Sequence, residues 1–309
     1  MLKHYLYRII LPLLLVISAA AQSDTSYSRV FVFGDSLSDT GNLASVLGNF
    51  PAPYYMNRIS NGPVAVETLA ARLGLTAEAS LHLIGAEVGS NYAVSGASAS
   101  GAESIDLDTQ IMIFQSNHGF VAPADALYVI FIGGNDVRTA RDVSDLSTAQ
   151  AIVNDAATDA GNAIESLAQS GARSFLVVNA PNIGSIPETH LIAAATDEPE
   201  LLKRTRKLSK LYRSKLHNII DKLEDNSNLD IKEFDLFKFF TGLLRNADAY
   251  GFINSTDACF SSVSFTFHPD CNNGSNFDQF VFFDEIHPTA RVHALVGDAF
   301  YETLSKNDD

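Results

Sequence analysis

The chain has 309 residues, of which 46% are hydrophobic and 18% are charged, and its formal net charge is −15. This is the composition of a globular protein and not of a disordered one. Because nonspecific binding to nucleic acid needs a basic surface, the acidic balance argues against a nucleic-acid partner.

Residues 1–21 are predicted to be a signal peptide. Lys3 and Arg8 give a positive start, a short apolar run follows, and small residues ending at Ala21 resemble a cleavage site. The apolar run is shorter than the roughly 20 residues that span a bilayer. We therefore expect an exported protein, extracellular or periplasmic, in which residues 22–309 form a single domain.

Short apolar runs that end at Gly, Asn or Pro predict buried strands. They cover residues 29–33, 126–132, 174–178 and, as a weaker edge strand, 229–234. Helical patterns lie between and after them, at residues 64–73, 107–115, 149–170, 200–225 and 289–304. This alternation predicts an α/β fold with a parallel sheet that helices cover on both faces.

In such sheets, the functional groups collect in the loops beyond the carboxyl ends of the strands. The first strand is followed by Gly34-Asp35-Ser36-Leu37, which places a serine at a strand-to-helix turn. Taken alone, this segment is more typical of an ordinary turn than of a nucleophile. A second segment, Asn91–Ser98, contains Gly96 among small residues, so a backbone N–H could face a site there, although a tight turn is the simpler interpretation.

Two further segments carry chemistry. Asn135 follows Gly133-Gly134 at the end of the most apolar strand, where a side-chain amide could stabilise an oxyanion or simply cap a helix. Asp284 and His287 are three residues apart, close enough for the carboxylate to fix one imidazole nitrogen and leave the other free to accept a proton from a serine.

These four segments, in this order, resemble the blocks of the GDSL, or SGNH, hydrolase family, and the resemblance runs from Phe33 to Thr289. It implies a three-layer α/β/α, flavodoxin-like fold with about five parallel strands. It also implies acyl transfer through a serine ester without a metal or an organic cofactor.

Carried over to this chain, the resemblance implies Ser36 as the nucleophile, His287 as the general base and Asp284 as the residue that orients it. The implied oxyanion hole consists of the Ser36 and Gly96 backbone N–H groups and the Asn135 side chain.

The longer string Gly34–Asn42, together with Ser60-Asn61-Gly62-Pro63, is similar to the secreted bacterial branch of lysophospholipases A and glycerophospholipid:cholesterol acyltransferases. This implies release of fatty acid from lysophospholipids, with acyl transfer as a further activity. A short-chain, carbohydrate or choline-ester esterase on the same fold is the alternative, and a catalytically idle exported lipid-binding protein is a third hypothesis.

Cys259 and Cys271 are the two cysteines of the chain. In an oxidising compartment we expect them to form a disulfide, the alternative being two buried free thiols. An apolar helical stripe containing Leu236 and Phe240 precedes them, and a cluster of phenylalanines surrounds them. We hypothesise that the loop closed by the disulfide shapes an acyl site, although such aromatic residues more often form ordinary core.

Residues 203–215 contain seven cations on an amphipathic helix. They could contact anionic lipid headgroups, so transient contact with a membrane or micelle is one hypothesis. A solvated face of a packed helix is the simpler interpretation. The sequence does not determine the oligomeric state.

Overall fold

The structure is a computed structural model that describes residues 27–226 and 228–306. The predicted signal peptide lies outside these residues. Among the described residues, no helix is both long enough and apolar enough to cross a membrane.

The main sheet is parallel, with the strand order β1-β2-β3-β4 in the described part of the chain. Its strands are β1 (Val30–Gly34), β2 (Leu127–Phe131), β3 (Ser174–Val178) and β4 (Asp230–Phe234). The four predicted strands are therefore confirmed, and β4 lies at the edge as predicted. Residues of β1 and β2 are buried throughout, because helices cover both faces of the sheet.

The family resemblance implied about five strands, and the fifth is reduced to a short extended segment beside β1. The Tyr92 N–H donates to the Val32 carbonyl at 2.7 Å, and the Val94 N–H donates to the Gly34 carbonyl at 3.0 Å. This pairing continues the sheet past β1 and brings the segment before Gly96 to the carboxyl end of that strand.

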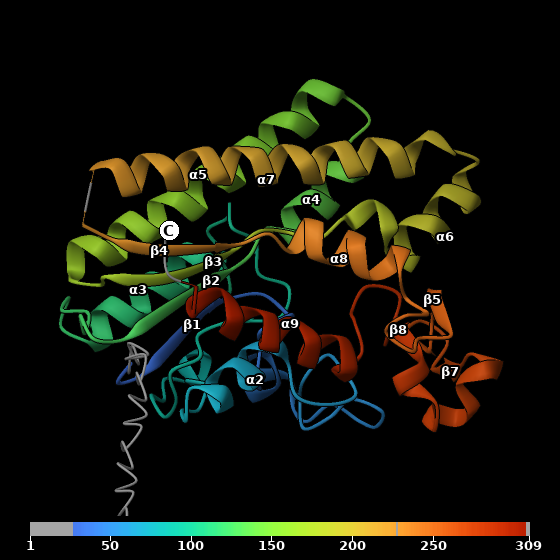
Figure 1. Cartoon of the computed structure of the whole chain (residues 1–309), viewed down its shortest axis with the longest axis horizontal. Helices are drawn as coiled ribbons and strands as arrows, with labels where there is room; N and C mark the ends of the chain where they lie inside the picture. The colour runs from blue at the N-terminus through green and yellow to red at the C-terminus, as the bar shows by residue number, and fades with distance from the viewer. Residues whose placement is uncertain (1–26, 227, 307–309) are drawn as a thin grey trace, which may run out of the picture.

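Helices form the two outer layers (Figure 1), with α5 and α7 on one side of the sheet and α2 and α9 on the other. The helices are α1 (Asn42–Leu47), α2 (Ala65–Arg72), α3 (Leu107–Asn117), α4 (Gly134–Arg141), α5 (Leu146–Ser170), α6 (Pro187–Thr196), α7 (Glu200–Asn226), α8 (Leu236–Arg245) and α9 (Ala290–Leu304). The three-layer α/β/α fold is confirmed. Helices α1, α4 and α6 were not predicted from the sequence.

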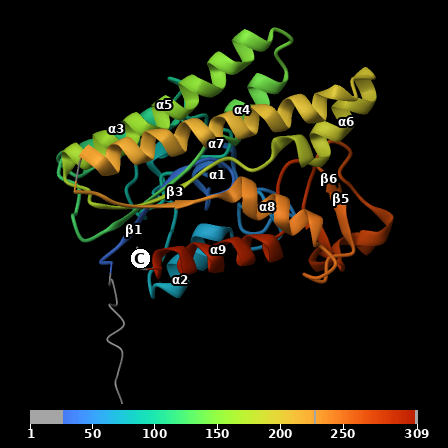
Figure 2. The same ribbon diagram turned by 45° about the horizontal axis from the view of Figure 1, so that its top comes forward.

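A smaller region, residues 254–282, lies beyond one end of the main sheet (Figures 1 and 2). In it β5 (Asn254–Ala258) pairs with β8 (Phe280–Phe282), and β6 (Phe260–Ser261) pairs with β7 (Thr266–Phe267). The Cys259–Cys271 disulfide is present, as predicted.

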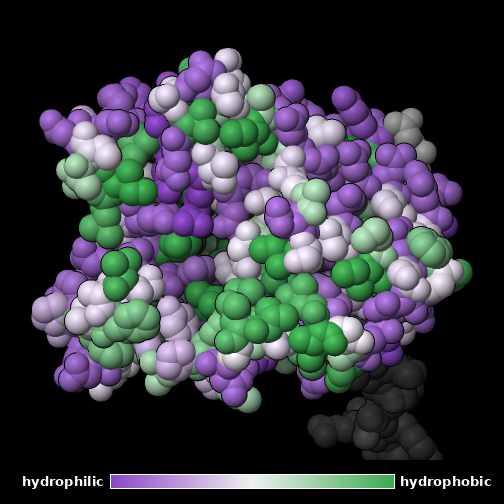
Figure 3. All heavy atoms as spheres, turned by 180° about the vertical axis from the view of Figure 1, so that it is seen from behind, coloured by the Kyte–Doolittle hydropathy of each residue, from purple (hydrophilic) through white to green (hydrophobic). Residues whose placement is uncertain are grey.

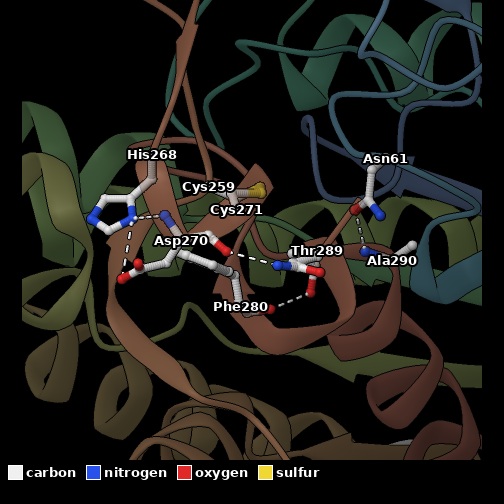
Figure 4. Close-up of a disulfide and its surroundings, with 9 residues drawn as sticks. Asn61, Cys259, His268, Asp270, Cys271, Phe280, Thr289 and Ala290 are labelled. Atoms are coloured by element: carbon white, nitrogen blue, oxygen red, sulfur yellow. Dashed lines mark hydrogen bonds and ion pairs between the residues drawn. A yellow bond between two sulfur atoms is a disulfide. The ribbon is translucent and has the colours of Figure 1, made fainter. Parts of the chain in front are cut away.

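This region is tied to the start of α9 (Figure 4). The Thr289 hydroxyl donates to the Phe280 carbonyl at 2.9 Å, and the Ala290 N–H donates to Asn61 Oδ1 at 2.9 Å. The Ser60 hydroxyl donates to the Pro288 carbonyl at 3.0 Å. The Ser60-Asn61 pair therefore anchors the chain directly after His287.

Several cations of the segment 203–215 contact the fold itself. Arg204 donates to the Arg141 carbonyl at 2.8 Å, and Arg213 forms an ion pair with Asp235 at 2.6 Å. These contacts favour the interpretation of α7 as a packed helix with a solvated face.

Candidate active site

Ser36 lies at the carboxyl end of β1, where the backbone must pass close to β2. A Cβ atom on Gly34 would lie 2.2 Å from the Phe131 carbonyl oxygen, so only glycine fits there. The Gln110 side chain then holds both polar groups of Gly34, accepting its N–H at 2.9 Å and donating to its carbonyl at 2.8 Å. The turn that carries Ser36 is thus fixed from two directions.

The structure brings Ser36, His287 and Asp284 together. His287 Nε2 lies 2.8 Å from Ser36 Oγ, and His287 Nδ1 lies 2.8 and 2.9 Å from the two Asp284 carboxylate oxygens. The carboxylate is an acceptor only, so Nδ1 carries the hydrogen and Nε2 is left to accept the serine proton. Asp284 Oδ1 also accepts the Ile286 and His287 N–H groups at 2.9 and 2.7 Å, which fixes the carboxylate itself.

Three buried carboxylates, those of Asp39, Asp106 and Asp136, hold the loop that carries Gly96. The Asp39 carboxylate accepts the Ser95 N–H at 2.8 Å, and the Asp106 carboxylate accepts the Ser98 N–H at 2.8 Å. The Asp136 carboxylate accepts the Ala99 and Ser100 N–H groups at 2.9 and 3.1 Å. The Gly96 N–H has no acceptor among the described residues, and Gly96 has a φ of +94°. The N–H groups on either side of Gly96 are therefore bonded within the protein, and the Gly96 N–H remains available as a donor.

Asn135 lies in the first turn of α4, directly after β2. Its Nδ2 donates to the Ala97 carbonyl at 2.8 Å, and its Oδ1 accepts from Arg138 Nη1 at 3.1 Å. Within the part of the chain that the structure describes, the second hydrogen on Nδ2 and the Ser36 N–H also find no acceptor. Asn135 and Ser36 line the same pocket, and the bond to Ala97 ties Asn135 to the Gly96 loop. The arrangement can stabilise a negatively charged oxygen beside Ser36 Oγ.

Two other titratable groups in the pocket are shifted by burial. Burial raises the pKa of Asp35 to about 6, although the Leu37 N–H and the nearby His287 lower it. Burial lowers the pKa of His293 to about 3, so this histidine is neutral. Its Nδ1 accepts the Ala65 N–H at 3.2 Å, so its Nε2 carries the hydrogen. His293 therefore cannot replace His287 as a base.

An apolar pocket extends from Ser36 and His287 into the protein. Its apolar walls come from β2, the loop after β3, α8, the loop before α9 and α9 itself: Phe131, Pro181, Ile183, Ile186, Leu236, Phe240, Ile286, Pro288, Val292 and Val296. Leu236 and Phe240 belong to the helical stripe singled out in the sequence. No group of three or more His, Cys, Asp or Glu side chains in the described residues has an arrangement that could hold a metal ion.

The loop closed by the disulfide does not line this pocket, contrary to our hypothesis that it shapes the acyl site. Its aromatic side chains pack on one another instead, with Phe260 against Phe267 at 5.3 Å between ring centroids. The loop contacts the Asp284–His287 segment, because Ser262 donates its N–H and hydroxyl to Glu285 at 3.0 and 2.7 Å.

Several residues that support this site were not predicted from the sequence. Asp39 lies within the string that resembled the family, and its position four residues after Asp35 gave no indication of its role. Gln110 and Glu188 carried no signal, since their partners are 76 and 50 residues away. Arg138 follows Asn135 by one helical turn, a spacing that could have been noticed once α4 was recognised.

Comparison with known proteins agrees with the sequence resemblance. Residues 30–300 match the sequence model of the family described as GDSL-like Lipase/Acylhydrolase. The chain is 27% identical to a phosphatidylcholine-sterol acyltransferase from Aeromonas hydrophila, over 84% of this chain and 73% of that one. It is 24% identical to a thermolabile hemolysin from Vibrio parahaemolyticus, over 92% and 65% of the two chains. An acetylxylan esterase structure from Geobacillus stearothermophilus aligns with a TM-score of 0.45 at 14% identity, over 90% and 94% of the two chains. The match to the family over most of its length shows that this chain belongs to the GDSL lipase/acylhydrolase family.

Proposed function

We propose that the protein is a serine ester hydrolase that releases long-chain fatty acid from lysophospholipids, with acyl transfer to a second alcohol as a further activity. The observation that carries this proposal is the apolar pocket that begins at Ser36 and His287. Each buried CH₂ of an acyl chain contributes about 0.8 kcal/mol, so an apolar pocket beside the nucleophile favours an acyl group longer than acetyl. The acyltransferase name of the Aeromonas hydrophila relative is in keeping with it.

In the proposed mechanism, Ser36 Oγ attacks the ester carbonyl while His287 Nε2 takes its proton. The carbonyl oxygen becomes an oxyanion, which the Ser36 N–H, the Gly96 N–H and Asn135 Nδ2 stabilise. Asp284 holds the resulting imidazolium. His287 then returns the proton to the leaving glycerol oxygen, and the acyl group stays on Ser36 as an ester.

Deacylation repeats these steps with water or a second alcohol as the nucleophile. His287 removes a proton from the incoming oxygen, the acyl–Ser36 bond breaks, and the proton returns to Ser36 Oγ. Fatty acid is released if the acceptor is water, and a new ester forms if it is an alcohol.

The proposal includes export and transient contact with a lipid surface. The N-terminal sequence pattern and the disulfide support export. The disulfide loop exposes Val263 and Phe265, and Met56 is exposed two residues after Tyr54, which contacts Phe260 of that loop at 5.9 Å between ring centroids. Figure 3 shows hydrophobic side chains gathered into a broad patch, beside a hollow in the same face. Exposed apolar groups of this kind support contact with micelles or membranes.

The test measures fatty-acid release from oleoyl lysophosphatidylcholine, alongside hydrolysis of p-nitrophenyl butyrate, for the wild type and Ser36→Ala. Ser116→Ala, an exposed serine on α3, is the matched control. We expect the wild type and Ser116→Ala to release oleate, and Ser36→Ala to lose activity on both esters by at least about 10³-fold.

Each other outcome favours a different function. Turnover of butyrate without turnover of lysophosphatidylcholine would reject the lysophospholipase and favour a short-chain, carbohydrate or choline-ester esterase. If neither ester is hydrolysed and an organophosphonate leaves Ser36 unlabelled, the protein is a lipid binder without catalysis.

A further inference from the structure

The Asn135 side-chain amide is held at both of its ends. Its Nδ2 donates to the Ala97 carbonyl, and Arg138 Nη1 donates to its Oδ1 at 3.1 Å. A guanidinium group has donors and no acceptor, so Arg138 can bond only the oxygen end of the amide. The Ala97 carbonyl, which only accepts, and Arg138, which only donates, therefore favour the same orientation of the amide, and Arg138 is the group that holds its oxygen end.

Arg138 is itself fixed by Glu188, which lies on α6. Arg138 Nε donates to Glu188 Oε2 at 2.8 Å and Nη2 donates to Oε1 at 2.5 Å, an arrangement with two parallel bonds. Arg141, which is 2% exposed, donates a further bond to Glu188 Oε2 at 2.7 Å. A paired fork of this kind sets the guanidinium plane as well as its position.

The same residue also reaches the segment that carries the histidine. The Glu188 N–H donates to the Glu285 carbonyl at 2.8 Å, between Asp284 and His287. Glu188 thus connects the end of the site that contains Asn135 with the end that contains His287. The two ends belong to segments about 150 residues apart in the chain.

We propose that Arg138, clamped by Glu188, is a positioning residue that keeps the Asn135 amide turned toward the oxyanion formed at Ser36. This rests on the proposed function, because it assigns a role within that oxyanion hole. Arg138 does not touch the reacting atoms in this scheme and acts through Asn135.

The competing interpretation is that Arg138 and Glu188 form an ion pair that only stabilises the fold. The chain provides a matched control for that case in Arg58 and Glu67. Arg58 Nε and Nη2 donate to the two Glu67 carboxylate oxygens at 3.2 and 2.5 Å, which is the same paired arrangement. The side chains of Arg58 and Glu67 are 15% and 21% exposed, compared with 26% and 21% for Arg138 and Glu188. A variant of Arg58 loses a comparable ion pair away from Asn135.

The experiment is a double-mutant cycle on p-nitrophenyl butyrate hydrolysis, with kcat and KM measured for Arg138→Met, Asn135→Ala and the double variant. We expect Arg138→Met to lower kcat about 10-fold while KM stays within about twofold, because the contact acts on the transition state. In the Asn135→Ala background the same change should alter kcat by less than about twofold. Arg58→Met should retain the wild-type kcat.

A 10-fold loss in both backgrounds would overturn the proposal, since Arg138 would then act independently of Asn135. A change in KM alone, or an equal loss in Arg58→Met, would also overturn it. Removing Arg138 leaves Glu188 paired with Arg141, so the Glu188 carboxylate keeps a partner.

If Arg138→Met does not fold, as judged by its thermal unfolding midpoint, Arg138→Lys and Glu188→Gln take its place in the cycle. The expected non-additivity with Asn135→Ala is the same. Failure of the proposed function would be separate and visible beforehand, as a wild type that does not hydrolyse the ester or a Ser36→Ala variant that still does.

Discussion

Asp35 is expected to make the folded protein less stable as the pH rises toward neutrality. It lies next to Ser36, it is 2% exposed, and its carboxylate accepts the Leu37 N–H at 3.0 Å. Burial raises its pKa from 3.8 to about 6. The single backbone bond does not offset the loss of hydration, so the charged form is disfavoured in the folded state.

The size of the effect follows from the difference in pKa between the folded and unfolded chains. A shift from 3.8 to about 6 at about 1.36 kcal/mol per pH unit gives about 3 kcal/mol. Because the folded pKa is raised, this stability is fully present below pH 3.8. Between that pH and about 6, the folded protein binds the proton that the unfolded chain has lost, so the free energy of unfolding falls. Above pH 6 the loss is complete.

Asp35→Asn keeps an oxygen to accept the Leu37 N–H and removes the titration. The free energy of unfolding of the wild type and the variant is measured in urea at intervals between pH 4 and pH 7.5. We expect the stability difference, which is the free energy of unfolding of Asp35→Asn minus that of the wild type, to increase by about 2.4 kcal/mol over this range, because about 0.6 kcal/mol is already lost at pH 4. Asp155→Asn, an exposed carboxylate on α5, is the control and should show a much smaller change.

The refuting result is a difference between Asp35→Asn and the wild type that stays constant with pH, or that decreases. Either outcome would mean that Asp35 is held as an anion in the folded protein, and that His287 and Arg138 outweigh the effect of burial.

Three further predictions concern the pocket, the disulfide and one backbone turn. Val296→Phe should fill part of the apolar pocket and lower kcat/KM for an oleoyl ester about 10-fold while leaving a butyrate ester within about twofold, a ratio measured by competing the two substrates. Replacing Cys259 and Cys271 by serine should lower the free energy of unfolding in urea by about 3 kcal/mol, because the closed loop no longer restricts the unfolded chain. Gly133→Ala should cost at least about 2 kcal/mol in thermal unfolding, because Gly133 has a φ of +111° and a Cβ there would lie 2.2 Å from the Tyr212 ring. An unchanged oleoyl-to-butyrate ratio in Val296→Phe would contradict the first prediction. An unchanged stability in the cysteine variant or in Gly133→Ala would contradict the second or the third.

The main sheet and the segments of the site could be predicted from the sequence because their signals are local. Runs such as residues 127–131 are apolar at every position, which follows directly from burial on both faces. Asp284 and His287 are three residues apart, so the contact between them needs only a turn. Ser36 and Asn135 each follow a strand, and parallel strands bring such positions to one edge of the sheet.

The supporting contacts could not be predicted in this way. Glu188 meets Arg138 across 50 residues, and Gln110 meets Gly34 across 76. The sequence shows that these side chains are polar but not which partners they have, because any exposed helix also carries glutamates and glutamines. The same is true of the disulfide loop. Its phenylalanines are evident in the sequence, but the sequence does not show that they pack on one another and not along the pocket.

The layered fold and its four main strands could be predicted from the sequence alone, because they follow from short-range periodicity. The residues of the site were singled out by the resemblance of four short segments to one family. The folded structure was needed to show how the Asn135 amide is turned, which N–H groups of the Gly96 loop are satisfied, and that β2, α8 and α9, rather than the disulfide loop, line the apolar pocket. These features depend on side chains packing across distant segments. Their geometry is set by the whole fold at once, so no local pattern along the chain records it.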